Sequence, residues 1–407
     1  MAGAAIPNDV RDPLVEPVPA GLTRSGAVRL DAIDMLRGLV IAIMVLDHVR
    51  DYFHAGAVQN PTDPATTVLL LYLTRWVTHL CAPTFVFLAG VSILFQKENG
   101  KPPAELSRFL LTRGTWLVLL ECTVITFGFN FGEPFLFLQV IWAIGFGMIC
   151  MAALARLPAA AVLAFGVAII ALCPLAIPAT EGAADGWGIA RTILLAPGLM
   201  PGAPVLAMYA AIPWLGVMCL GFGLGPVFRR PAAERARAVL TIALVMLALF
   251  VVLRLVNAFG DPAPWSEQAN AGRTAMSFFN VSKYPPSPDY VLVTLGLSLL
   301  VFLALERLRG PVARVLLDFG RTPLFSYVAH IYLAHGLMLA VAFAYGVPQA
   351  ALDYLADAIS GAPPVAWGFS LGGVYLVWAL VIAALIPLAR WFAGIKRRRR
   401  DWWLSYL

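Results

Sequence analysis

Ten long apolar segments cover most of this chain, and they constrain its fold more than any other feature. Each has 17 to 25 residues, and about 20 apolar residues in a helix cross the ~30 Å hydrocarbon core of a membrane. Charged or Pro/Gly-rich stretches separate them. The predicted spans are 34–53, 80–96, 107–129, 136–156, 159–178, 204–227, 236–257, 289–307, 322–346 and 369–393. We therefore expect an all-α polytopic membrane protein with about ten transmembrane helices.

The composition excludes the alternatives to a membrane fold. Hydrophobic residues make up 60% of the chain and charged residues 13%, whereas soluble domains have about 45–50% and about 25%. A disordered chain, a coiled coil and a soluble α/β fold are excluded on this ground. The net charge of +6 is explained by the orientation in the membrane, so no nucleic-acid partner is expected.

The distribution of cations predicts the orientation. If the ten spans cross in turn, 23 of the 29 Lys and Arg residues fall on the side of the N-terminus. Loops rich in Lys and Arg stay in the cytoplasm, so both termini are expected there. Arg is far commoner than Lys, and Ala, Gly and Pro are abundant. This bias is typical of a GC-rich bacterial genome, which indicates the bacterial cytoplasmic (inner) membrane.

The chain divides into one large domain and two short ends. Residues 1–29 lack a long apolar stretch and are expected to form a disordered cytoplasmic tail. Residues 30–395 form a single transmembrane domain, and the basic and aromatic residues 396–407 form a cytoplasmic anchor. The outer loops are expected at 54–79, 179–203, 258–288 and 347–368, with a short interfacial helix in 185–203 and strands only as loop fragments.

The first span contains the sharpest polar pattern. His48 follows Arg37 by eleven positions, which is about three helical turns, so both lie on one face about 16 Å apart. Asp34 can pair with Arg37, and Asp51 is three residues after His48, so it can hold the imidazole in one tautomer. Asp47 points about 100° away. A buried histidine backed by a carboxylate is a general-base arrangement; the alternative is that His48 only supports helix packing.

Other ionisable residues lie within the spans or near their outer ends. Such groups are expensive in a membrane and commonly face a cavity or a partner. His330 and His335 point about 140° apart, so only one is expected to face the same cavity as His48. Glu121 is either an interhelix hydrogen-bond partner or a cavity acid. Lys283, in an outer loop, is a candidate to meet an anionic group. The histidines and acids show no metal-ligand spacing, so no metal is expected.

Several stretches resemble a known family. They are RLDAIDMLRGLVIAIMVLDHVRDYF, LTRWVTHLCAPTFVFLAGVSILF, RTPLFSYVAHIYLAHGL and RRRRDWWLSYL. They are similar to the bacterial branch of the heparan-alpha-glucosaminide N-acetyltransferase catalytic-domain family. The Arg37-x10-His48 spacing also resembles the acyltransferase-3 membrane enzymes. The resemblance implies transfer of an acetyl or acyl group from cytoplasmic acyl-CoA to a sugar or glycan on the outer side, with His48 as catalytic base. The lysosomal branch has its essential histidine in the following loop, where His54 is the nearest counterpart, so both stay candidates.

The expected roles follow from this chemistry. The catalytic candidates are His48, Asp51, Asp47 and His54. A developing oxyanion needs hydrogen-bond donors. Candidates for this role or for contact with the substrate are Arg50, Arg75, His79, Glu121, Lys283, His330 and His335. The acyl-CoA phosphates need cations on the inner side, for which Arg37, Arg113 and Arg321 are candidates. Acyl-CoA is a co-substrate and no permanent cofactor is expected; membrane lipid and a second copy in a homodimer are the other expected partners.

Two other classes of function fit the polar residues in the spans. A proton-coupled transporter uses intramembrane acids and histidines, but it predicts inverted repeats with broken helices, and the sequence shows no such repeat. A membrane protein without catalytic activity is the third alternative. An acyltransferase assay separates the first class from the other two.

Overall fold

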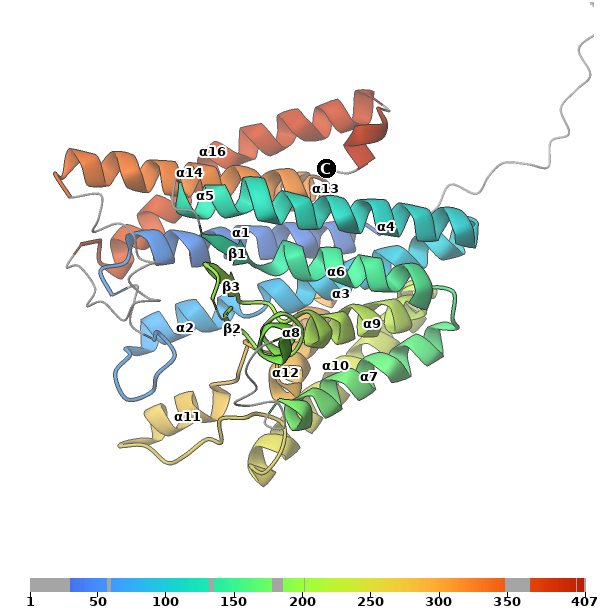
Figure 1. The fold of residues 1–407 in the computed structure, drawn as a ribbon, viewed down its shortest axis with the longest axis horizontal. Coiled ribbons are helices and arrows are strands. Elements are labelled where there is room, and N and C mark those ends of the chain that lie inside the picture. The colour runs from blue at the N-terminus through green and yellow to red at the C-terminus, as the bar shows by residue number, and fades with distance from the viewer. Residues whose placement is uncertain are drawn as a thin grey trace, which may run out of the picture. The chain divides into compact units, whose positions relative to one another are not determined.

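The structure is a computed structural model, and it describes residues 30–56, 60–131, 135–177, 186–200, 202–347, 367–399 and 401–405. The predicted tail 1–29 and most of the predicted outer loop 347–368 lie outside the described residues. The helices are α1 (Asp31–Phe53), α2 (Leu69–Thr78), α3 (Cys81–Glu98), α4 (Pro103–Leu120), the π-helix η1 (Glu121–Ile125), α5 (Thr126–Asn130), α6 (Val140–Leu154), α7 (Ala159–Ala176), α8 (Gly186–Leu194), α9 (Ala211–Phe228), α10 (Ala232–Val256), α11 (Ala271–Phe279), α12 (Pro288–Leu305), α13 (Pro311–Arg321), α14 (Pro323–Ala344), α16 (Leu371–Arg398) and the 3₁₀ helix η4 (Trp402–Ser405). Most of the long helices run side by side (Figure 1).

The predicted all-α membrane architecture is confirmed. Each of the ten predicted spans contains a helix or a continuous run of helices. Eight helical segments among the described residues are long and apolar enough to cross a membrane, counting α2 with α3 and α4 with α5. The other two are α1, which carries several charged residues, and α6, which has 15 residues. The protein is therefore a multi-pass membrane protein.

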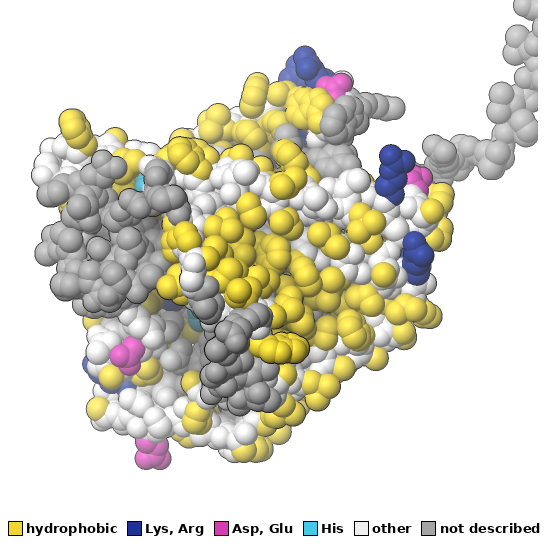
Figure 2. Space-filling view, viewed as in Figure 1, with side chains coloured by type: hydrophobic (Ala, Val, Ile, Leu, Met, Phe, Trp, Pro, Cys, Tyr) yellow, Lys and Arg dark blue, Asp and Glu magenta, His cyan; other side chains and the backbone are white. Residues whose placement is uncertain are grey.

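Burial separates inner helices from outer ones. α3 and α9 pack against each other and are largely buried, whereas α7, α10 and α16 expose most of their apolar surface. Apolar side chains accordingly dominate the middle of the molecular surface (Figure 2). Backbone groups in hydrocarbon must be hydrogen-bonded internally, which a helix achieves, so these outer helices suit contact with lipid.

α1 is a buried helix that α3, α12, α13, α14 and α16 contact. Its approach to α13 is very close, because small residues let the two backbones meet. A Cβ on Gly38 would lie 1.9 Å from the carbonyl oxygen of Leu316, and one on Gly320 would lie 1.8 Å from that of Asp34. Only glycine fits at either position, and this contact fixes the part of α1 that carries Arg37.

A small sheet corrects the predicted starts of two spans. β1 (Leu136–Leu138) pairs in parallel with β3 (Val205–Ala207), which pairs antiparallel with β2 (Gly198–Leu199). The spans predicted to begin at 136 and 204 begin as strands, and α6 and α9 follow at Val140 and Ala211. A short apolar run is compatible with either a strand or a helix, so hydropathy could not place this boundary.

Three regions outside the ten predicted spans contain helices. α2 occupies part of loop 54–79, and α11 lies in loop 258–288. α13 lies where an inner loop was expected, with Ala313, Leu316 and Phe319 buried at helical spacing. The short helix expected in 185–203 is present as α8.

Candidate functional site

Two cavities adjoin in the helical domain. The first, which we call the histidine cavity, contains His48 and has a volume of about 230 Å³. The second, which we call the arginine cavity, contains Arg37 and Arg113 and has a volume of about 340 Å³. Four side chains line both cavities and so form their common wall: Met44, Phe85, Val140 and Tyr327.

His48 is held by a second histidine. Its Nδ1 atom lies 2.7 Å from Nε2 of His330, and the two ring planes are only 10° apart. Nδ1 of His330 in turn lies 3.0 Å from the carbonyl oxygen of Ser326. His330 is completely buried, whereas His48 is partly exposed and lines the histidine cavity. Of the two α14 histidines only His330 contacts His48, and neither lines the histidine cavity, although one of them was expected to face it.

This chain of bonds determines the tautomer of both rings. The Ser326 carbonyl can only accept, so Nδ1 of His330 carries a hydrogen and donates it. Nε2 of a neutral His330 is then an acceptor, and it takes the hydrogen on Nδ1 of His48. The remaining nitrogen of His48, Nε2, keeps its lone pair. The arrangement therefore prepares His48 as a proton acceptor.

The carboxylate expected to orient His48 has another partner. Asp51 pairs with Arg50 at 2.5 Å, so the residue that fixes the imidazole is His330, not Asp51. Asp47 accepts from Arg75 at 2.8 Å and pairs with Arg50 at 3.0 Å. The i, i+3 spacing permits an Asp51–His48 bond, but the adjacent guanidinium attracts the carboxylate more strongly.

The histidine cavity has a positively charged lining. Its ionic side chains are Asp47, Asp51, Arg50, Arg75 and Lys283, so cations outnumber carboxylates. Lys283 is buried and forms no ion pair among the described residues. Its ammonium lies 5.0 Å from the ring centroid of Tyr284. Burial alone would raise the pKa of Tyr284, but Lys283 and Arg75 lower it below its ordinary value.

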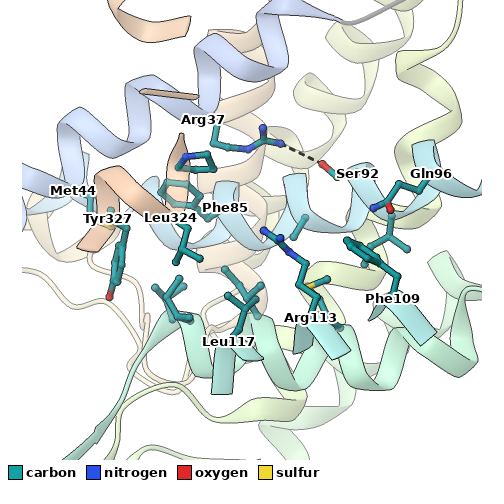
Figure 3. A pocket seen from close by; sticks show the side chains of 17 residues that line it. Arg37, Met44, Phe85, Ser92, Gln96, Phe109, Arg113, Leu117, Leu324 and Tyr327 are labelled. Atoms are coloured by element: carbon teal, nitrogen blue, oxygen red, sulfur yellow. Dashed lines mark hydrogen bonds between the residues drawn. The ribbon is translucent and has the colours of Figure 1, made fainter. Parts of the chain in front are cut away.

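The arginine cavity lies between α1, α3, α4, α6 and the start of α14. Arg37 donates to Asp34 at 3.0 Å and to the hydroxyl of Ser92 at 3.2 Å. Arg113 points into the same space from α4, and Tyr327 lies at the opposite end from Gln96 (Figure 3). Two cationic side chains and an apolar wall suit a ligand with anionic groups and a thinner, uncharged arm.

Arg321, the third predicted acyl-CoA ligand, is not among the side chains that line the arginine cavity. It pairs with Asp31 at 3.2 Å and approaches Asp34 at 4.0 Å. Because Asp34 also accepts from Arg37, Arg321 is connected to the cavity through a shared carboxylate.

Besides Arg321 and His330, four other predicted site residues lie outside the lining of both cavities. His54 accepts from the backbone N–H of Gly56, and burial followed by the charge of Arg50 lowers its pKa. His79 is buried against the ring of Tyr290. Nδ1 of His335 lies 2.8 Å from the carbonyl oxygen of Gly128.

The fourth of these residues, Glu121, is an interhelix hydrogen-bond partner. Its carboxyl oxygens accept from the backbone N–H groups of Gln139 at 3.1 Å and Trp142 at 2.9 Å. These groups belong to the first turn of α6, where free N–H donors need acceptors. Glu121 therefore caps α6 and holds the backbone of Gln139 beside the histidine cavity.

Sequence reasoning missed the aromatic and amide residues of the site. Tyr209, Tyr284, Gln139 and Tyr327 line the histidine cavity, and Tyr327 also lines the arginine cavity. Tyr327 could have been found, because it precedes His330 by three residues and so lies beside it on the same helix face. Gln139 follows β1, Tyr209 follows β3 and Tyr284 lies in an outer loop, and these short segments show no periodicity.

Comparison with known proteins gives one result for the chain. A family model described as "Heparan-alpha-glucosaminide N-acetyltransferase, catalytic" matches residues 29–254. This range begins just before α1 and ends within α10, so it includes Arg37, His48, Arg75 and Arg113. A search of curated proteins finds no significant match.

Proposed function

The chain belongs to the heparan-alpha-glucosaminide N-acetyltransferase catalytic family, and from this premise we propose that it transfers an acetyl or other acyl group from acyl-CoA to a sugar or glycan. Membership supports a role as a membrane-bound transferase, and the eight apolar helices agree with it. The donor, the acceptor side and the catalytic base are our proposals.

The adjoining cavities carry this proposal. Arg37 and Arg113 provide positive charge for the phosphates of acyl-CoA in the arginine cavity, and His48 lines the next cavity. An acyl-CoA whose thioester lies at the common wall would reach the two arginines with its phosphates and His48 with its carbonyl carbon. The acceptor would enter the histidine cavity and present its hydroxyl or amine to His48. His48 is a better candidate than His54, which lines neither cavity.

The reaction proceeds by addition and elimination. Nε2 of His48 takes the proton of the acceptor hydroxyl or amine as the acceptor atom bonds to the thioester carbon. The carbonyl oxygen becomes negative in the tetrahedral intermediate. When the C–S bond breaks, the sulfur of CoA takes the proton from His48, and the neutral imidazole returns. His330 accepts from Nδ1–H throughout, so it stabilises the charged imidazolium.

The predicted orientation assigns the two cavities to opposite halves of the membrane. Arg37 lies in the half of α1 nearer the N-terminus, which the positive-inside rule places at the cytoplasm, where acyl-CoA is found. His48 lies in the other half. The acceptor therefore approaches from the outer face of a bacterial inner membrane.

The test uses purified full-length protein in lipid nanodiscs with [¹⁴C]acetyl-CoA and a panel of amino sugars, neutral glycans and acidic glycans. We expect label transfer and release of CoA with wild type, a loss of about 10²- to 10⁴-fold with His48→Ala, and retained activity with His54→Ala. Absence of transfer to every acceptor would refute the proposal. Equal activity of His48→Ala would remove His48 as the base.

A further inference from the structure

The tetrahedral intermediate needs hydrogen-bond donors for its oxyanion, and three residues expected for this role, Arg75, His79 and His330, are already hydrogen-bonded or lie outside both cavities. Arg75 donates to Asp47 and to Thr78. His79 does not line either cavity, and both nitrogens of His330 have partners. Nη1 of Arg75 and both nitrogens of His330 are therefore occupied, and His79 lies away from both cavities.

Tyr327 offers a further donor, at the wall that the two cavities share. Its side chain is 3% exposed, and its hydroxyl has no hydrogen-bond partner among the described residues. A buried hydroxyl without a partner is costly, and such groups in native structures call for an explanation. A hydroxyl that is completed only when a ligand binds is one explanation.

The position of Tyr327 agrees with this explanation. It is one of the four side chains that line both cavities, and Figure 3 shows it at the end of the arginine cavity beside Met44. Its ring centroid lies 6.4 Å from that of His48 and 5.5 Å from that of His330. A thioester carbonyl at the common wall would therefore lie between the base and the Tyr327 hydroxyl.

Gln139 offers a second donor in the lining of the histidine cavity. Its Nε2 atom is also buried without a partner among the described residues, and its side chain lines the histidine cavity. Its backbone is held by Glu121 at the start of α6. Two donors are the usual composition of an oxyanion hole, and fixed donors act strongly because they need no rearrangement during the reaction.

We infer that Tyr327 is a catalytic residue whose hydroxyl, with the Gln139 amide as second donor, binds the thioester carbonyl oxygen and stabilises the oxyanion. This inference rests on the proposed acyl transfer. No proton leaves the tyrosine: the hydroxyl donates a hydrogen bond that shortens as charge develops on the oxygen and lengthens again when CoA departs. The acceptor proton passes only through His48.

The decisive variant is Tyr327→Phe in the full-length protein, which removes the hydroxyl and keeps the ring. We expect kcat to fall by about 10²-fold, with the KM for acetyl-CoA within about twofold of wild type. Gln139→Leu should also lower kcat, by a smaller factor. Tyr332→Phe is the matched control, because Tyr332 lies on the same helix, lines neither cavity and donates to the carbonyl oxygen of Val124 at 2.7 Å.

If the hydroxyls of Tyr327 and Tyr332 had only a structural role, the relative damage to the two variants would be reversed. Tyr332→Phe loses an existing hydrogen bond and Tyr327→Phe loses none, so the control would then be the more damaged variant. Unchanged kcat in Tyr327→Phe, with wild type active, would overturn the inference and leave the proposed acyl transfer intact.

A spectroscopic measurement tests the hydrogen bond without an acceptor. Infrared difference spectra of bound [1-¹³C]acetyl-CoA should show the thioester carbonyl stretch at lower frequency in wild type than in Tyr327→Phe, because a donated hydrogen bond weakens the C=O bond. Equal frequencies in the two proteins would overturn the inference. A shift in wild type together with no transfer to any acceptor would refute the proposed acyl transfer alone.

Discussion

Nδ1 of His48 lies 2.7 Å from Nε2 of His330, although 282 positions separate the two residues in the chain. α1 supplies one ring and α14 the other, so the proposed base is complete only when these helices are packed. Because His330 also donates to the carbonyl oxygen of Ser326, the direction of every hydrogen bond in the chain is fixed.

The first prediction concerns this pair. His330→Ala should lower kcat by about 10²-fold, since His48 loses the acceptor that fixes its tautomer, and the KM for acetyl-CoA should change little. His330→Gln should recover part of the loss, because its amide oxygen can accept from Nδ1–H. His335→Gln is the control, since His335 lies on the same helix outside the cavity lining. If His330→Ala and His335→Gln reduce kcat equally, His330 does not act as the specific partner of His48.

The second prediction concerns the donor. Arg113→Gln and Arg37→Gln should each raise the KM for acetyl-CoA by about 10-fold or more, because a charge-assisted hydrogen bond to a phosphate contributes about 1.5–3 kcal/mol. The KM for the acceptor should stay constant. Arg314→Gln serves as control, since Arg314 is exposed on α13 and lines neither cavity. Steady-state kinetics with both substrates varied would measure these constants, and an unchanged acetyl-CoA KM would count against the arginine cavity as the donor site.

The third prediction concerns the α1–α13 contact. Gly38→Ala should lower the melting temperature, because the new Cβ would lie 1.9 Å from the carbonyl oxygen of Leu316; overpacking costs about 1–3 kcal/mol. Gly336→Ala on α14 is the matched control. A Cβ there meets no atom within 4 Å, so the melting temperature should stay constant or rise. Thermal unfolding in one detergent checks both, and equal behaviour would contradict the close approach.

The fourth prediction concerns Lys283. Lys283→Met should raise the KM of an acidic acceptor and leave that of a neutral acceptor unchanged, because it removes the cation that has no ion-pair partner among the described residues. It should also raise the pKa of Tyr284, which Lys283 helps to lower. Spectrophotometric titration at 295 nm, with Tyr284→Phe as the reference, would follow this phenol. A Tyr284 pKa that stays low in the variant would show that Lys283 does not account for the shift.

The positions of the transmembrane helices were predicted well, because a helix that crosses the hydrocarbon core needs an apolar run of about 20 residues. The sequence placed Arg37 and Arg113 on one side of a site and His48 on the other, and the structure places their side chains in adjoining cavities. Helical periodicity placed Arg37 and His48 along one face of the first span, and the cation distribution placed Arg113 on the side of Arg37. α13 was missed although its apolar residues recur at helical spacing, because its charges made it resemble a loop.

The part that could not be predicted consists of contacts between distant segments. Asp51 satisfied the local spacing rule for contact with His48, but Arg50 lies next to it and forms the bond. The partner of His48 comes from α14, and a single sequence gives no information on which helices meet. The short strands that bring Tyr209 to the cavity could not be predicted either, since a three-residue strand has no recognisable period.

Arg37 and His48 belong to one helix without proline or interruption, and this has a consequence for the choice of donor. The separation between the charge that would hold the nucleotide end and the base that would act on the acyl end is set by backbone geometry, not by loops that can adjust. A donor must therefore have a fixed reach. A truncated thioester bound at Arg37 would leave its carbonyl short of His48, so the helix would select donors by the length of their arm.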